Sequence, residues 1–277
     1  MGAIIWLASY PKSGNTWVRA FLHNLLRNPD KPVDINTLNA FCLGEDKAEY
    51  YNHFDPRPLT TLTDKEIAEL RPKAHQLLTQ AFPDSVFVKT HNYMGEWEDV
   101  PLVTMEETAG AIYIIRNPLD VAISFAHHFG LTIDETIEQM ADLSMGTPTT
   151  DTSVRQVYSS WSNNVISWTQ HDLPSLHVIR YEDMLSRPFE AFSGVATFLG
   201  LKPPRNRLQR AIAKSSFKVL RNQEDKHGFI ERSAHTRFFR EGKAGQWKTG
   251  LAPEQVASIV STHREQMERF KYVPKGY

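Results

Sequence analysis

Residues 10–17, which read Tyr-Pro-Lys-Ser-Gly-Asn-Thr-Trp, constrain the fold of this chain more than any other stretch. The preceding residues, 3–8, are apolar and predict a buried strand, whereas residues 16–27 carry their apolar side chains on one helical face. A loop between a strand and a helix start presents backbone N–H groups and the positive end of the helix dipole to an anion. The sequence therefore predicts a phosphate-binding, P-loop-like turn in an α/β fold.

The side chains of this loop suit an anion but not an ordinary ATP or GTP cradle. Lys12 and the hydroxyls of Ser13 and Thr16 can donate directly to anion oxygens. A Walker A motif places its lysine after a second glycine, whereas Lys12 precedes the single glycine, Gly14. For the loop alone, a strand-to-helix turn with a solvated lysine is the structural alternative.

Further strand and helix patterns alternate along the chain. Strands are expected at 85–89, 111–115 and 176–180, and helices at 64–82, from Asn117-Pro118 onward, at 154–170 and at 189–199. The polar stretch 29–58 is expected to be a surface loop or a cover of the substrate site. This alternation predicts one α/β domain over residues 1–277, with a central parallel sheet flanked by helices.

Composition limits the cellular setting and the partners. The single cysteine, Cys42, cannot form an intramolecular disulfide and fits a reducing compartment. The chain has no apolar run near the ~20 residues that a membrane span needs, and the first apolar run is too short for a signal peptide. We therefore expect a cytoplasmic protein without a membrane partner.

Charge is distributed unevenly although the net charge is only -1. Residues 31–110 hold 7 Lys/Arg and 14 Asp/Glu, whereas residues 202–248 hold 13 Lys/Arg and 4 Asp/Glu. The basic segment predicts an anionic ligand. Since it lacks a nucleic-acid-binding motif, a small polyanion is favoured over nucleic acid.

Polar residues follow the predicted strands where each one ends. Lys12 follows the first strand, Lys89 and His91 the second, Arg116 the third and Tyr181 the fourth. In a parallel sheet these ends meet at one edge, where ligands bind. A histidine there can accept a proton from a substrate hydroxyl, because its ordinary pKa near 6.5 suits general-base work.

Two more groups of residues suit phosphate binding. Arg116 with Ser124, on the following helix, forms a potential phosphate clamp, although pairing of Arg116 with Asp120 is an equally good structural alternative. Segment 237–248 combines cations, aromatics and two glycines, and its alternative is a mobile basic loop. No cluster of His, Cys or carboxylate residues has metal-binding spacing, so we expect no metal.

These motifs, in this order, resemble the cytosolic sulfotransferase family, whose members transfer a sulfuryl group from 3′-phosphoadenosine 5′-phosphosulfate (PAPS). The resemblance runs from residue 4 to about residue 270. The N-terminal stretch looks closest to bacterial members that sulfate secondary metabolites. The matching segments are 10–17 (5′-phosphosulfate loop), 88–91 (catalytic base), 113–124 (3′-phosphate strand and helix), 180–183 (adenine-side tyrosine), 215–217 (second nucleotide contact) and 240–248 (glycine motif).

The resemblance implies a role for each matched residue. The catalytic residues are His91 as base, with Lys12 and Lys89 stabilising the transferring group. Nucleotide binding is implied for Lys12, Ser13, Gly14, Asn15, Thr16, Trp17, Arg116, Ser124, Tyr181, Ser215, Phe217, Arg240, Glu241 and Gly242. Glu241 departs from the family, which usually has a basic residue there. The dimer motif of many animal members is not recognisable at 249–253, so the sequence makes no prediction of oligomeric state.

The predicted function is sulfuryl transfer from PAPS to a hydroxyl or amine of a small molecule, by in-line displacement with His91 as base. One alternative is a phosphotransferase with a divergent phosphate loop, which would need Mg²⁺ and ATP. The other is an inactive nucleotide-binding protein, which has no need of Lys89 and His91. The acceptor is not identified by the sequence, and its pocket is expected to be covered by 41–58 and 127–150.

Overall fold

The computed structural model describes residues 2–171, 173–232 and 236–277. They form two compact units that alternate along the chain. Unit 1 contains the residues up to Tyr10, Cys42–Tyr113 and Met140–Val178. Unit 2 contains Pro11–Phe41, Ile114–Gln139 and Ile179–Tyr277.

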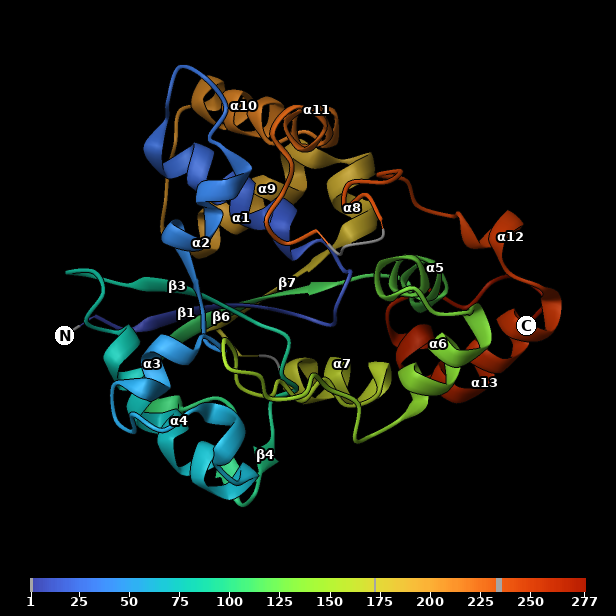
Figure 1. Cartoon of the computed structure of the whole chain (residues 1–277). Helices are drawn as coiled ribbons and strands as arrows, with labels where there is room; N and C mark the ends of the chain where they lie inside the picture. Colours follow the sequence, from blue (N-terminus) through green and yellow to red (C-terminus); the bar gives the residue numbers. More distant parts are fainter. Residues whose placement is uncertain (1, 172, 233–235) are drawn as a thin grey trace. The chain divides into compact units, whose positions relative to one another are not determined.

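A central parallel sheet organises unit 1, which confirms the predicted fold class (Figure 1). β1 and β2 both pair with β3 in parallel, and most apolar residues of β1, β3 and β6 are buried. The last residues of β6 and β7 continue into unit 2. In spatial order the strands are β2 (Cys42–Gly44), β3 (Val86–Thr90), β1 (Ile4–Ser9), β6 (Thr108–Ile115) and β7 (Leu176–Arg180).

The helices between residues 48 and 78 in unit 1 pack around an apolar cluster that includes Tyr51 and Ile67. The helix at 64 begins with a capping box, in which the Thr63 hydroxyl accepts from the Glu66 N–H and the Glu66 carboxylate accepts from the Thr63 N–H. α3 and α4 lie side by side in Figure 1. The elements are α3 (Ala48–Asn52), η2 (Leu59–Thr61), α4 (Asp64–Leu78), η3 (Met105–Glu107), α7 (Trp161–Thr169) and the hairpin of β4 (Glu96–Trp97) and β5 (Val100–Pro101).

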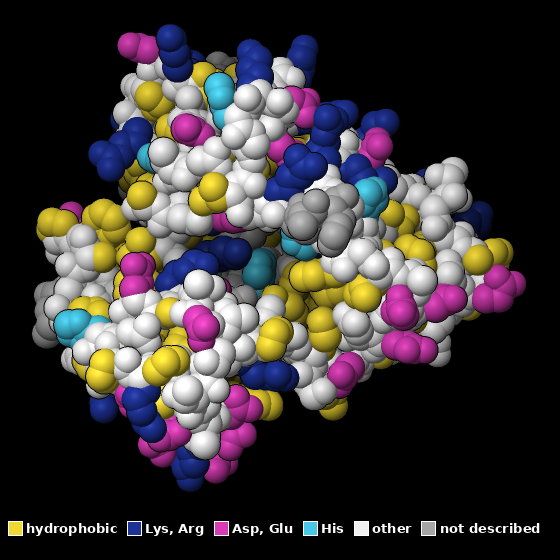
Figure 2. Space-filling view, viewed as in Figure 1, with side chains coloured by type: hydrophobic (Ala, Val, Ile, Leu, Met, Phe, Trp, Pro, Cys, Tyr) yellow, Lys and Arg dark blue, Asp and Glu magenta, His cyan; other side chains and the backbone are white. Residues whose placement is uncertain are grey.

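Helices dominate unit 2. α1 packs against α10, and α12 and α13 pack against α5. In the face shown in Figure 2, Lys and Arg side chains gather over α10 and α11, within the predicted basic segment. The helices are α1 (Asn15–Arg27), η1 (Ile35–Thr37), α2 (Leu38–Phe41), α5 (Pro118–Phe129), α6 (Ile133–Ala141, ending in unit 1), α8 (Tyr181–Ser186), α9 (Pro188–Phe198), α10 (Arg205–Lys214), α11 (Phe217–His227), α12 (Trp247–Gly250) and α13 (Pro253–Arg269).

Three predicted elements differ from the structure. Stretch 29–58 is not a plain loop, since it contains η1, α2, α3 and the edge strand β2. The helix predicted at 154–170 begins only at Trp161, because Val157 forms a bridge with Gly146 and bonds through its N–H and C=O to Asn92 and Tyr93. The helix predicted at 64–82 ends at Leu78. Among the described residues, no helix is long and apolar enough to cross a bilayer.

Candidate active site

The turn before α1 has the backbone of an anion site. Lys12 and Gly14 both adopt left-handed φ angles, of 66° and 104°. A Cβ on Gly14 would lie 2.8 Å from Cδ2 of Tyr181, so only glycine fits there without displacing that ring. The first turn of α1 carries no acidic residue. Its N–H groups form the positive end of the helix dipole, and the Glu231 carboxylate, 3.4 Å from Thr16 Oγ1, is paired with Arg19.

Buried donors at this turn fit a ligand that offers several acceptors. Within the described chain, Ser13 Oγ, Trp17 Nε1 and Arg116 Nε are buried and have no hydrogen-bond partner. Leaving such a group unpaired costs ~1–3 kcal/mol. Arg116 also donates from Nη1 to the Lys12 carbonyl at 2.9 Å, which ties the end of β6 to the loop. The loop, α1 and Arg116 thus form one cradle, and its donor set suits phosphate oxygens.

Arg116 does not use Asp120 as its partner in the described structure. Its guanidinium lies 4.3 Å from the ring centroid of Tyr181. The Asp120 carboxylate instead accepts from the N–H groups of Gly245 and Trp247, at 2.6 and 3.1 Å. Asp120 therefore anchors residues 240–248, here called the glycine segment, to α5.

The glycine segment packs on α11. Gly242 has a φ of 64°, and a Cβ there would lie 2.3 Å from Cγ of Phe217. A pocket of about 420 Å³ adjoins this contact, lined in part by Ile123, Arg240 and Lys243. Arg240 donates to Gln246 Oε1 on its rim. These features fit a second anionic group.

The remaining predicted nucleotide residues of unit 2 lie as follows. Lys12 Nζ is 4.0 Å from the Phe238 ring centroid, and the rings of Trp17 and Tyr181 meet edge to face. Burial raises the pKa of Tyr181, with Arg116 opposing, so its hydroxyl stays neutral. Asn15 is buried, Ser124 is half-buried on α5, and Glu241 is exposed with Lys243 3.7 Å away.

Ser215 has a constraint that its sequence motif did not reveal. Its hydroxyl is buried and donates to the carbonyl of Ala211 at 2.9 Å. Because its hydrogen is used within α10, a contact with a ligand would have to use its lone pairs. Its nucleotide contact stays a prediction.

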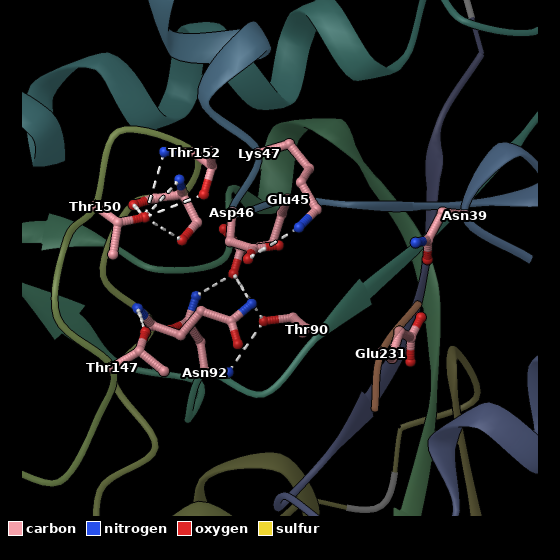
Figure 3. A network of polar contacts seen from close by, with 12 residues as sticks. Asn39, Glu45, Asp46, Lys47, Thr90, Asn92, Thr147, Thr150, Thr152 and Glu231 are labelled. Carbon is pink, nitrogen blue, oxygen red and sulfur yellow. Dashed lines mark hydrogen bonds and ion pairs between the residues drawn. The ribbon is translucent and has the colours of Figure 1, made fainter. Parts of the chain in front are cut away.

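The sequence did not predict a partly buried ion pair beside the loop. Arg19 Nη2 donates to Glu231 Oε1 at 2.6 Å and to Thr16 Oγ1 at 3.2 Å. Its Nη1 donates to Asn39 Oδ1 at 3.1 Å, and Asn39 and Glu231 are both labelled in Figure 3. Arg19 is fully buried, so the available signal was an arginine on the apolar face of α1.

Unit 1 carries the two remaining predicted catalytic residues, Lys89 and His91. Lys89 is half-buried in β3, where it is the register partner of Leu7 in β1. His91 Nδ1 lies 2.8 Å from the carbonyl oxygen of Ser9. Since a carbonyl only accepts, Nδ1 carries the hydrogen, and Nε2 holds the lone pair of the neutral ring. His91 is therefore held in the tautomer that a base acting through Nε2 requires.

The described residues contain no group of three or more His, Cys, Asp or Glu side chains arranged to hold a metal ion. The donors above are hydroxyl, indole, guanidinium and backbone groups. This chemistry binds anions rather than cations.

Comparisons with known proteins identify the family and the fold. A family model described as a sulfotransferase domain matches residues 4–271. Sulfotransferase 1A1 of Canis lupus familiaris is 23% identical over 276 residues, covering 95% of this chain and 82% of that protein. Mouse sulfotransferase SULT7A1 complexed with PAP shares the fold with a TM-score of 0.62 and 22% identity, over 97% of this chain and 85% of that chain. Retinol dehydratase in complex with retinol and PAP also shares the fold, with a TM-score of 0.66 and 21% identity, and the match covers 96% of this chain and 81% of that chain.

Proposed function

This chain belongs to the sulfotransferase family, and from that premise we propose that it transfers a sulfuryl group from PAPS to a hydroxyl or amine of a small molecule. One observation carries the choice of donor. It is the cradle of unit 2, where Ser13, Trp17 and Arg116 present buried donors around the left-handed turn at Gly14. Adenosine 3′,5′-bisphosphate (PAP) is the product expected from PAPS, and its two phosphates match the two anion-binding features of that unit.

The residues of unit 2 divide between the two ends of the nucleotide. Lys12, Ser13, Thr16 and the loop amides hold the 5′ side, because they surround the start of α1. The residues near Arg116 and in the glycine segment bind the 3′-phosphate and the adenine base. We assign Arg116, Ser124, Arg240 and the Gly242 backbone to the 3′-phosphate, and Trp17, Tyr181, Ser215 and Phe217 to the adenosine, while exposed Glu241 adds no cationic contact.

We assign the predicted catalytic residues of unit 1 to activation of the acceptor and to the transferring group. His91 Nε2 takes the proton of the acceptor hydroxyl, while Nδ1–H stays bonded to the Ser9 carbonyl. Lys89 and Lys12 stabilise the negative charge that develops around the transferring group. When bound, PAPS supplies the sulfuryl group, which leaves its phosphate by in-line displacement.

We extend the proposal to the setting of the reaction. Residues 1–277 act as one sulfotransferase domain in the cytoplasm, without a nucleic-acid or membrane partner. The N-terminal stretch 4–17 supports an acceptor from bacterial secondary metabolism. The solved retinol dehydratase holds retinol, a small alcohol, which supports a small-molecule acceptor here.

Calorimetry tests the choice of donor. PAP is titrated into the protein without metal, and ATP is titrated in parallel with and without Mg²⁺. PAP should bind ~10- to 100-fold more tightly than ATP, since the 3′-phosphate adds at least one charge-assisted bond worth ~1.5–3 kcal/mol. Tighter binding of ATP with Mg²⁺ would instead favour a phosphotransferase.

Turnover with ³⁵S-labelled PAPS and a panel of phenols, alcohols, amines and sugars tests the chemistry. His91→Ala should lower kcat ~10²-fold or more and leave the Kd of PAP unchanged, as loss of a general base predicts. His171→Ala, an exposed histidine of unit 1 outside the segments expected to cover the acceptor, is the matched control and should keep full activity. PAP binding without turnover on any acceptor would indicate an inactive nucleotide-binding protein.

A further inference from the structure

Glu45 is a buried carboxylate at the end of β2 for which the proposed reaction has no direct use. Its side chain is fully buried. Its backbone N–H donates to the carbonyl of Lys89 at 3.4 Å, which continues the pairing of β2 with β3. Glu45 therefore lies against the strand end that carries Lys89 and leads to His91.

The carboxylate gathers four donors. Oε1 accepts from Thr90 Oγ1 at 3.2 Å, from Asn92 Nδ2 at 2.7 Å and from Gln156 Nε2 at 3.1 Å. Oε2 accepts from Nη1 of buried Arg71 at 2.9 Å. Figure 3 shows Glu45, Thr90 and Asn92 converging in this network.

Two of these donors flank His91 in the sequence. Thr90 Oγ1 also accepts from the Asn92 N–H at 3.0 Å, which closes a tight turn around His91. Asn92 Oδ1 accepts from the Val157 N–H at 2.6 Å, so the same amide is held on both sides. Hydrogen bonds to Glu45 thus hold the two residues that flank His91, and the hydrogen bond to the Ser9 carbonyl holds the His91 ring.

All four neighbours donate, so the group that satisfies them all is the ionised carboxylate, the form that prevails above about pH 7. An amide has one acceptor oxygen, so its NH₂ group would face either Arg71 or the three donors on the other side. An apolar side chain would leave every donor of the turn unpaired. Thr90 and Asn92 would then be free to change rotamer, and the direction of the His91 ring would no longer be unique.

We propose that Glu45 is a positioning residue for His91, which aims the imidazole by holding Thr90 and Asn92 on either side of it. The proposal rests on the proposed function of His91 as the base. It adds that correct alignment of the base depends on a buried side chain from a different strand. Glu45 itself does not touch the substrate.

Glu45→Gln tests the proposal in steady-state assays with labelled PAPS. We expect kcat to fall ~10- to 100-fold, as for a reacting group displaced by about 1 Å. The Kd of PAP should stay within about twofold of the wild-type value, because every predicted nucleotide residue lies in unit 2. The ¹⁵N shifts of the His91 ring should also change from those of a single tautomer to an average.

The same substitution in a His91→Ala background separates positioning from general damage. If Glu45 acts through His91, Glu45→Gln has no further effect on kcat in that background. A merely structural role would lower kcat by the same factor in both backgrounds, and that result would overturn the proposal.

Thr90→Val keeps the proposal testable if Glu45→Gln does not fold. It removes the hydroxyl that donates to Glu45 and accepts from the Asn92 N–H, so it should also lower kcat. Thr90→Ser keeps this hydroxyl and should keep kcat near the wild-type value. Ile67→Ala, a cavity in the apolar cluster of unit 1, is the control for lost stability and should keep kcat at a temperature where it is folded.

The outcomes distinguish the two proposals. A wild-type protein that neither binds PAP nor uses PAPS contradicts the proposed function. A wild-type protein that turns over, with full kcat in both Glu45→Gln and Thr90→Val, contradicts only the positioning role.

Discussion

Gly242→Ala probes the contact between the glycine segment and α11. A Cβ at this position would lie 2.3 Å from Cγ of Phe217 and 2.5 Å from each of its Cδ atoms. Ordinary contact begins near 3.4 Å, so the ring or the segment must move by about 1 Å. The backbone also has a φ of 64°, which an alanine adopts only with strain.

The expected magnitude combines these two effects. Left-handed backbone costs a non-glycine residue ~1–2 kcal/mol. A shift of about 1 Å should also break at least one of the proposed charge-assisted bonds to the 3′-phosphate, worth ~1.5–3 kcal/mol. The backbone strain is present in both the free and the bound protein, so it does not change the affinity. Only the lost bond to the phosphate weakens binding, and the Kd of PAP should therefore rise ~10- to 100-fold.

Calorimetric titration of PAP measures this change, and Gly200→Ala is its matched control. Gly200 has a similar φ of 71°, but no neighbouring atom lies within 4 Å of the position of its Cβ. The control therefore shares the backbone strain without the overlap, and it should bind PAP like the wild type. Unchanged affinity in Gly242→Ala, or an equal loss in both variants, would refute the reasoning.

The remaining predictions concern the cradle and the buried network. Asp120→Asn should lower the free energy of unfolding by ~1–3 kcal/mol in urea titrations, since one of the two backbone N–H groups it accepts from loses its acceptor. Arg116→Met should raise the Kd of PAP ~10- to 100-fold in calorimetry, and unchanged affinity would make the arginine structural. Burial raises the pKa of Glu45 to about 7, although Arg71 opposes it. From about pH 4.5 to about 7 the folded state therefore keeps a proton that the unfolded state releases, so the free energy of unfolding should fall as pH rises. Urea titrations across this range should show a flatter pH dependence for Glu45→Gln, and an unchanged slope would contradict the assignment.

Elements with local signals were predictable from the sequence. Asn117 caps α5 with its side chain and Pro118 takes the first helical position, as the dipeptide indicates. β7 matches its predicted bounds, Leu176–Arg180, because a short run rich in apolar residues suffices to indicate a strand, even though Ile179 alone of its residues is buried.

Elements that depend on distant partners were not predictable. β2 has only three residues, Cys42–Gly44, and is a strand because β3 offers it an edge. Val157 is extended because its backbone bonds Asn92 and Tyr93, which no helical periodicity at 154–170 reveals. Here tertiary hydrogen bonds override local preference.

The candidate site divides in the same way. The positions of Arg116 and His91 were predictable because each directly follows a strand, β6 or β3, whereas their roles in the reaction stay predictions. Arg19 and Glu45 were missed because a charged residue within a run gives no sign that its partner, Glu231 or Arg71, lies far along the chain. Burial of a charge is a property of the folded pair rather than of either residue.

The atom that sets the tautomer of His91 is a main-chain carbonyl, and this gives the base an unusual mutational robustness. Every residue type at position 9 supplies the same oxygen, so no single substitution there deletes the hydrogen-bond acceptor. The buried Ser9 hydroxyl also lies 3.2 Å from this nitrogen, but its replacement would leave the main-chain acceptor in place. Only a slip of β1 against β3 would abolish it.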